Sequence, residues 1–175
     1  TVSVPGVDAG ADTLTTQFAR MFFTQYVQKY GAQKLSDAQL QQFTSDMIDS
    51  LAKSTARSST YSAKDITVSG TGAQAFRAYV IGAEDAFKAH TIATEKDELS
   101  YMSDAIEKND ASALPQVRAI GKAYAAIAKA YVKVPAPKEA QEAHLAVANA
   151  MVEVSDAILN MATIETDPIR ALVGL

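Results

Sequence analysis

Apolar residues recur at intervals of three and four positions along most of the chain, a spacing typical of amphipathic helices. Five helices are expected, at about 12–30, 36–53, 71–108, 111–134 and 137–165. The last two carry strict three-four alternation, as coiled-coil seams do. The pattern therefore predicts an all-α fold, an up-and-down bundle of about five helices. In chain order, the expected apolar stripes are Leu14, Phe18, Met21, Phe22 and Tyr26; Leu40, Phe43, Met47, Ile48 and Leu51; Phe76, Tyr79, Val80, Ala83, Phe87 and His90; Val117, Ile120, Tyr124, Ile127, Tyr131 and Val134; and Ala140, His144, Val147, Met151, Val154, Ile158 and Met161.

Residues with helix-capping side chains stand at the expected starts. Ser36 with Gln39, and Thr71 with Gln74, have the spacing of a capping box, in which cap and third residue satisfy each other's free backbone N–H groups. Gly31 stands where a left-handed residue would end the first helix. In that first helix Phe23 and Val27 widen the apolar stripe. We therefore expect the first helix to be well buried.

The third predicted helix contains two stripes that are out of phase. Phe87 and Leu99 are twelve residues apart, which rotates one stripe by about 120° from the other at about 100° per residue. Either the helix runs to about Lys108 with a rotating face, or it breaks near 91–94. We favour one long helix with a local irregularity there.

The remaining segments are short or irregular. Residues 65–69 alternate polar and apolar and include β-branched residues, which predicts an extended arm at about 62–70 that lies over the helices rather than in a sheet. Asp167 before Pro168 is typical of the start of a short C-terminal helix. Residues 1–11, with their Pro and Gly, are expected to form a flexible lead-in, and 12–175 a single helical-bundle domain.

Composition narrows the range of chemistry. The chain has 175 residues, of which 48% are apolar. It has no Cys, which excludes disulfides, thiolate metal sites and cysteine nucleophiles. The formal net charge of −4 speaks against nucleic acid as a primary partner and against anionic lipid headgroups. No uncharged apolar run approaches the length of a membrane helix. A membrane link would therefore run only through a segment upstream of Thr1.

The two histidines are the main candidates for chemistry, and both lie on expected apolar stripes. Neither His90 nor His144 has a Glu three residues before it, which excludes the di-iron motif of helical bundles. We interpret both as core histidines that bond a backbone carbonyl or a carboxylate. The acidic pairs at 84–85 and 97–98 are expected on solvated faces. Gly70 and Gly72 are interpreted as helix-start punctuation, not as a phosphate loop. We therefore predict no catalytic, cofactor-binding or metal-ligating residue, and no cofactor.

A family resemblance rests on an ordered set of short segments over about 61–175. They are Asp65-Ile66-Thr67-Val68, Ala78-Tyr79, Val134-Pro135, His144-Leu145 with Asn149, and Asp167-Pro168-Ile169-Arg170-Ala171-Leu172. In this set the chain resembles a family of uncharacterised helical proteins of candidate-phyla bacteria. These proteins are similar to products encoded beside type IV secretion or pilus components. The resemblance implies an extracytoplasmic, exported or membrane-anchored protein, and it brings no catalytic residues.

Three functional hypotheses follow. The first is a non-enzymatic, exported module that makes protein–protein contacts at the cell envelope, as an accessory to a type IV secretion or pilus apparatus. The start at Thr1 instead of Met leaves two interpretations: a processed or truncated exported protein, periplasmic or at the cell surface, or a piece cut from a cytoplasmic protein. We favour the first. The alternative is a periplasmic bundle that binds a small molecule, as a sensor or carrier, in an enclosed apolar cavity. An enzyme would need His90 or His144 beside a carboxylate in a cleft.

Overall fold

The computed structural model describes residues 13–31, 33–55 and 59–174. Within these ranges the regular structure is helical, with one isolated β-bridge, which confirms the all-α prediction. The predicted lead-in at 1–11 lies outside the described residues. The elements in chain order are α1 (Leu14–Tyr30), α2 (Asp37–Thr55), α3 (Gly72–His90), α4 (Glu98–Glu107), the 3-10 turn η1 (Ala111–Ala113), α5 (Leu114–Tyr131), the 3-10 turn η2 (Lys138–Ala140), α6 (Gln141–Met161) and α7 (Pro168–Val173).

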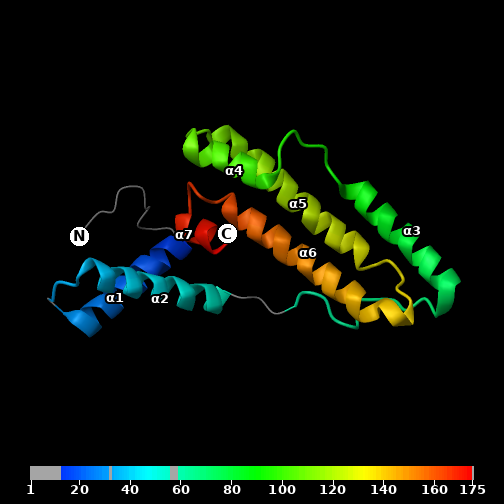
Figure 1. Ribbon diagram of the computed structural model, residues 1–175, viewed down its shortest axis with the longest axis horizontal. Helices are drawn as coiled ribbons and strands as arrows, with labels where there is room; N and C mark the ends of the chain where they lie inside the picture. The colour runs from blue at the N-terminus through cyan, green and yellow to red at the C-terminus, as the bar shows by residue number, and fades with distance from the viewer. Residues whose placement is uncertain (1–12, 32, 56–58, 175) are drawn as a thin grey trace.

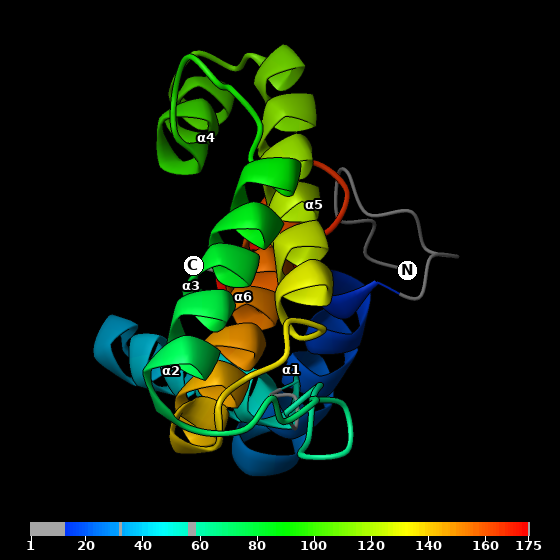
Figure 2. The ribbon, with the colours of Figure 1, turned by 90° about the vertical axis from the view of Figure 1, so that its right-hand side faces the viewer.

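The helices fall into two groups, joined by the shortest one. Helices α3 to α6 pack together on one side of the molecule, and α1 and α2 form an antiparallel hairpin on the other (Figure 1). The short α7 contacts both α1 and α6. Figure 2 shows α3, α5 and α6 running alongside one another, and α5 contacts both α3 and α6. The single-domain assignment of 12–175 stays a prediction.

Two apolar clusters lie at opposite ends of α5 and hold the α3–α6 group together. The first joins α4, α5 and the end of α6; its buried members are Met102, Leu114, Val117, Ile120, Ile158, Met161 and Ala162. The second joins α3, the end of α5 and the start of α6; its buried members are Ala86, Tyr131, Val132, Val134 and Ala148. The α5 seam predicted from the sequence thus lies in the core, with Tyr124 packed against the first cluster.

The apolar seam predicted for α6 is wrong in part. Val147 and Val154 remain about two-fifths exposed, while Ala148 and Ser155 are buried in their place. Small residues face α5 because the two helices cross closely there: a Cβ on Gly121 would lie 2.9 Å from Cγ of Leu159. The Ser155 hydroxyl donates to the Gly121 carbonyl at 2.8 Å. Close backbone approach therefore selects small side chains over the larger ones.

The long third helix that we favoured is also wrong, because it breaks into α3 and α4. Thr91 adopts extended backbone angles (φ −66°, ψ 131°), and its hydroxyl donates to the carbonyl of Phe87. Asp97 then caps α4 by accepting a hydrogen bond from the backbone N–H of Ser100 at 2.7 Å. The two stripes are out of phase because they belong to two separate helices.

The predicted caps have different outcomes. The box at Ser36 is confirmed: its backbone N–H donates to Oε1 of Gln39 at 3.0 Å, and the Gln39 N–H donates to the Ser36 hydroxyl. The box at Thr71 is wrong, since that side chain makes no capping bond. Gly70 and Gly72, which flank it, have φ of 104° and 84°, a region that favours glycine. Gly31, at the C-terminal end of α1, has φ 58°, and its backbone N–H donates to the carbonyl of Val27.

The first helix is not well buried, contrary to our expectation. Phe23 is 70% exposed and Val27 is 47% exposed. On the other face, Phe22, Tyr26 and Tyr30 stack along α1 and against Phe43 of α2, with ring centroids 4.9 to 6.3 Å apart. The hairpin contains only two helices, so one face of α1 has no partner among the described residues.

The extended arm is confirmed, and it has a partner that the sequence did not indicate. Val68 forms a parallel bridge with Ala136, in the link between α5 and α6. Nearer the start of the arm, the side chain of Asn149 exchanges two hydrogen bonds with the backbone of Tyr61, at 2.8 and 3.0 Å. Tyr61 and Ile66 pack against the second cluster. The arm therefore packs against the N-terminal half of α6 and is bonded to it through Asn149.

The C-terminal helix α7 begins at Asp167 as predicted, and the same carboxylate caps α1. Its Oδ2 accepts from the N–H of Leu14 at 2.9 Å, and its Oδ1 accepts from the N–H of Thr15 at 2.8 Å. The Thr15 hydroxyl also donates to it, and so does Nε of Arg170 at 3.0 Å. One buried side chain thus joins the hairpin to the rest of the protein.

Among the described helices, none combines the length and the hydropathy needed to span a lipid bilayer.

Candidate functional site

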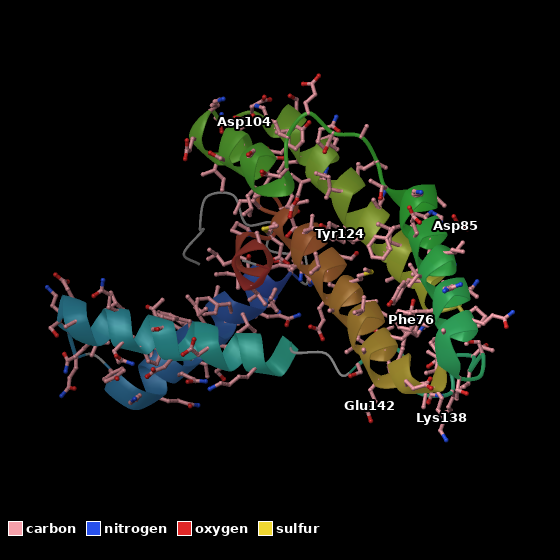
Figure 3. All side chains as sticks on the ribbon, turned by 45° about the vertical axis from the view of Figure 1, so that its right-hand side comes forward. Phe76, Asp85, Asp104, Tyr124, Lys138 and Glu142 are labelled. Carbon is pink, nitrogen blue, oxygen red and sulfur yellow. The ribbon has the colours of Figure 1, made fainter. Side chains whose placement is uncertain are left out.

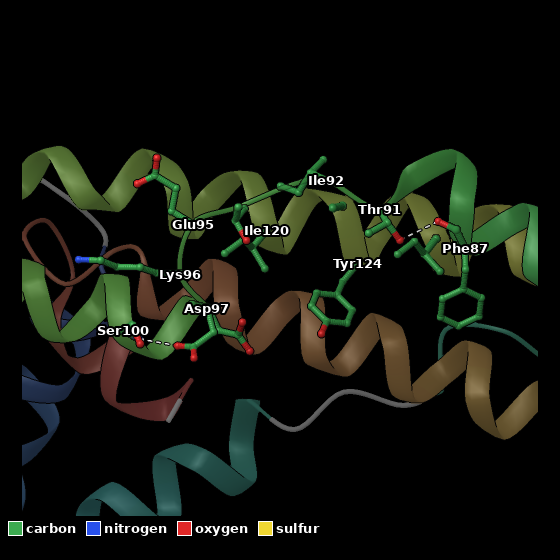
Figure 4. Close-up of a pocket in the computed structure, with 13 residues that line it drawn as sticks. Phe87, Thr91, Ile92, Glu95, Lys96, Asp97, Ser100, Ile120 and Tyr124 are labelled. Carbon is green, nitrogen blue, oxygen red and sulfur yellow. Dashed lines mark hydrogen bonds between the residues drawn. The ribbon is translucent and has the colours of Figure 1, made fainter.

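A groove of about 640 Å³ opens at the point where α3 ends and α4 begins. The connector 91–97 and the first turn of α4 form one wall, and Phe87 closes the end toward α3. Helix α5 forms the floor: Ile120 and Tyr124 point into the groove (Figure 4), and Ile127 also lines it. It lies between the two apolar clusters, at the part of α5 where α3 has ended.

The floor is apolar and partly open to solvent. Ile120 and Ile127 are only 7% and 6% exposed, whereas Phe87 and Ile92 at the rim are 37% and 40% exposed. Figure 3 shows Tyr124 directed into the bundle from α5, and Phe76 on the side of α3 that faces α6. Large apolar side chains exposed together around a concave surface are typical of binding sites.

The rim is mainly acidic. Glu95, Asp97 and Glu98 line the groove, and Lys96 is the one cation among its described lining residues. The ammonium of Lys96 is bonded to the carboxylate of Asp104, outside the groove lining, and this bond raises the pKa of Lys96. Asp104 also pairs with Lys108, so it offsets only part of the Lys96 charge, and three carboxylates line the groove against this one ammonium. The uncompensated charge at the rim is negative.

Asp97 in the groove lining and Asp104 beside it each make hydrogen bonds within the protein. Hydrogen bonds from Ser100 lower the pKa of Asp97, which stays ionised as the cap of α4. Hydrogen bonds from Lys108 and Lys96 lower the pKa of Asp104. The other predicted acidic pair lies elsewhere: Glu84 is exposed and bonded to Lys88 on α3. In the pair at 97–98, Asp97 is exposed as expected and Glu98 is half-buried, and both line the open groove.

His144 is a core histidine, as predicted. It is fully buried, and its Nε2 donates to the carbonyl of Val132 over 3.4 Å. Because the Nε2 proton is used in that bond, Nδ1 of the neutral ring accepts from the hydroxyl of Tyr79 at 3.3 Å. The hydroxyl of Tyr79 also bonds to the hydroxyl of Tyr131. Burial lowers the pKa of His144, and the Val132 bond offsets part of this effect. The ring is therefore neutral and tied into the core.

This buried chain of polar groups runs from His144 through Tyr79 to the hydroxyl of Tyr131. Burial, and then the hydrogen bond with Tyr79, raise the pKa of Tyr131, which keeps the Tyr131 phenol protonated. Among the described residues no carboxylate bonds to His144, and His90 lies half-buried at the end of α3, outside the groove lining. No group of three or more acidic or histidine side chains in the described residues is placed to hold a metal ion.

Sequence reasoning missed the groove, although one signal pointed to it. The phase difference between Phe87 and Leu99 located the irregularity, but it was interpreted as a distortion within one helix. Ending α3 at His90 removes the side chains that would otherwise cover the middle of α5. The break and the exposed floor are thus two consequences of the same local sequence.

Comparison of the chain with family models, with curated proteins and with solved structures found no match. The proposed function therefore depends on the groove itself.

Proposed function

We propose that this protein is a non-enzymatic helical module that works by binding another protein in the groove between 91–97 and α5. The single observation that carries the proposal is the combination of an apolar floor with an acidic rim. Ile120 and Ile127 offer apolar contact, and Glu95 and Glu98 offer negative charge on one side. A partner segment with apolar anchors flanked by Lys or Arg fits this arrangement.

The shape of the groove favours a peptide segment over a small molecule. Small-molecule sites bury most of the ligand surface, and their volumes run from about 300 to 1,000 Å³. The volume of this groove falls within that range, which keeps a periplasmic sensor or carrier as the second candidate. However, the groove is open along one side, and the core clusters at either end are filled. A helix or extended segment lying lengthwise uses such a surface better.

The cellular setting is a further part of the proposal. The resemblance over 61–175 supports an exported protein at the cell envelope, accessory to a type IV secretion or pilus apparatus. Fractionation of cells that express the full-length gene product with an epitope tag tests this setting. Recovery in the periplasmic or surface fraction is expected, and recovery with cytosolic enzymes would contradict it.

The groove itself is tested with two designed helical peptides. One carries leucines at helical spacing flanked by lysines, and the other carries the same leucines flanked by glutamates. Titration with the lysine peptide should shift the methyl NMR signals of Ile92, Ile120 and Ile127, and the glutamate peptide should bind at least tenfold more weakly. Equal shifts with both peptides would remove the role of the acidic rim.

Matched variants distinguish binding in the groove from nonspecific binding elsewhere on the protein. Ile92→Asp places a charge at the rim and should abolish the shifts at Ile120. Ile81→Asp changes a side chain of α3 that is 60% exposed and lies outside the groove lining, so binding should stay within twofold. Partners captured from envelope fractions should show the same dependence on the two positions.

A further inference from the structure

A second surface, on the opposite side of α5, carries charge of the other sign. Arg118, Lys122 and Lys129 lie on α5, and Lys133 follows its end, where Val132 keeps helical angles. At about 100° per residue these four side chains fall within an arc of roughly 60°, on the face turned away from the buried seam. All four are exposed. We call this set the basic stripe.

The basic stripe stands out against the rest of the chain. Between Leu114 and Pro137 the sequence contains no Asp or Glu, although the whole chain has 20 acidic and 16 basic residues. Among the described residues, no carboxylate forms a salt bridge with any member of the stripe. Arg118 donates one hydrogen bond to the carbonyl of Ala162, which fixes the guanidinium at one end of the row. The positive charge of α5 is therefore not compensated within the described chain.

The residues between the cations indicate what kind of surface could cover them. Ala125 is exposed and Ala126 half-buried in the middle of the stripe, and no large apolar side chain lies there. A lipid bilayer is held by aromatic or aliphatic side chains that enter its interface, and this face has none. Alanines instead let the backbone of a second helix come close, because interaxial distance depends on the side chains at the contact.

The spacing of the cations points the same way. Four-, seven- and four-residue steps separate the members of the stripe, which spans about 22 Å along the helix axis. Carboxylates at the same intervals on another helix also share one face, so two such helices lying side by side bring opposite charges together. We propose that the basic stripe is the docking surface for an acidic α-helix of a partner protein, separate from the groove.

The test uses the full chain and a fluorescent alanine-based peptide with glutamates at those same intervals. Fluorescence anisotropy should show binding that weakens at least tenfold between about 20 mM and about 150 mM salt. A peptide of identical composition, with its glutamates distributed around the helix, should bind at least fivefold more weakly. Equal binding of the two peptides would overturn the proposal, because only net charge would then matter.

Charge-reversal variants locate the binding surface. Lys122→Glu with Lys129→Glu should lower the affinity at least tenfold, and Lys122→Gln with Lys129→Gln by a smaller factor. The matched control, Lys34→Glu with Lys53→Glu, makes the same change of net charge at exposed positions of the hairpin and should stay within twofold. Circular dichroism must show that all three variants keep the helical content of the parent protein. Loss of binding in the control as well would also overturn the proposal.

Two other polyanions complete the experiment. A short DNA duplex and phosphatidylserine vesicles are titrated under the same conditions, with the same variants. Binding of either one more tightly than the glutamate peptide, with the same dependence on Lys122 and Lys129, would replace the acidic helix by nucleic acid or membrane. The groove variant Ile92→Asp should leave binding to the stripe unchanged. A negative result for the basic stripe is thus distinguishable from a negative result for the groove.

Discussion

The α1–α2 hairpin and the α3–α6 group have similar helical periodicity but are stabilised in different ways. The α3–α6 group encloses two apolar clusters, in which Leu114 and Val117 are fully buried. The hairpin buries few large side chains, and it is joined to α7 through the carboxylate of Asp167. Apolar spacing therefore predicts that a helix forms, whereas the number of neighbouring helices decides how much of it is buried.

The largest expected effect comes from the core of the α3–α6 group. Leu114→Ala removes a side chain that is 1% exposed and leaves a cavity. Stability should therefore fall by about 2–5 kcal/mol, which urea unfolding followed by circular dichroism measures. The control is Leu172→Ala, at a position 49% exposed. This control should change stability by less than about 0.5 kcal/mol. Similar losses in both variants would contradict the difference in burial.

The second-largest loss of stability is expected at the joint between the hairpin and the α3–α6 group, which we define as Asp167 with its partners Leu14, Thr15 and Arg170. Asp167→Asn keeps the shape but removes the charge that accepts from Leu14 and Thr15. The expected loss of stability is about 1.5–3 kcal/mol. Hydrogen exchange should accelerate at the amides of α1 and α7, while the amides of α5 stay protected. Asp110→Asn, which changes the cap of the exposed turn η1, is the control and should leave α1 unaffected. Uniform acceleration in all helices would show that the joint is not local.

The same joint should depend on pH. Burial alone would raise the pKa of Asp167, but hydrogen bonds from Thr15, Leu14 and Arg170 outweigh it and lower the pKa to about 2, from 3.8. Because the folded pKa is the lower one, this contribution is complete above about pH 4 and is lost as pH falls toward about 2. About 1–2 kcal/mol should disappear in that window.

Comparing the parent protein with Asp167→Asn between about pH 5 and about pH 2 isolates this contribution from other carboxylates. The stability difference between the two proteins should shrink as the solution becomes more acidic. A constant difference would mean that Asp167 stabilises the joint without its charge. His144 is present in both proteins and cancels in this difference: burial lowers its pKa, so it disfavours the folded state as pH falls below about 6.5.

Local features were the ones the sequence predicted well. The box at Ser36, the start of α7 at Asp167 and the buried seam of α5 each depend on residues within a few positions of one another. Features that join distant segments were missed. The carboxylate of Asp167 bonds to Leu14, 153 residues away, and the arm pairs with Ala136. Nothing in a hydrophobic pattern specifies such a pairing.

The groove was predictable only in part from the sequence. Its position follows from a local break after His90, which the phase of the apolar residues could locate. The packing of α5 against α6 could not be located in this way: Gly121 and Ser155 lie where the two helices are close, and Val154 stays exposed. A pattern of apolar residues cannot rank two faces of one helix when the smaller residues are the ones that pack.

The smallest expected effect belongs to the hairpin face that we had expected to be buried. Phe23→Ser removes an aromatic ring that is 70% exposed. Stability should therefore change by less than about 0.5 kcal/mol. Phe43→Ser, at a ring 5% exposed between α1 and α2, is the matched comparison and should open the hairpin. Hydrogen exchange of α2 distinguishes the two. A loss of stability in Phe23→Ser as large as that in Phe43→Ser would mean that another surface covers this face of α1 in solution. The helices of the α3–α6 group already pack against one another, so that surface would belong to a second copy of the protein. Sedimentation of the parent protein should then show a dimer.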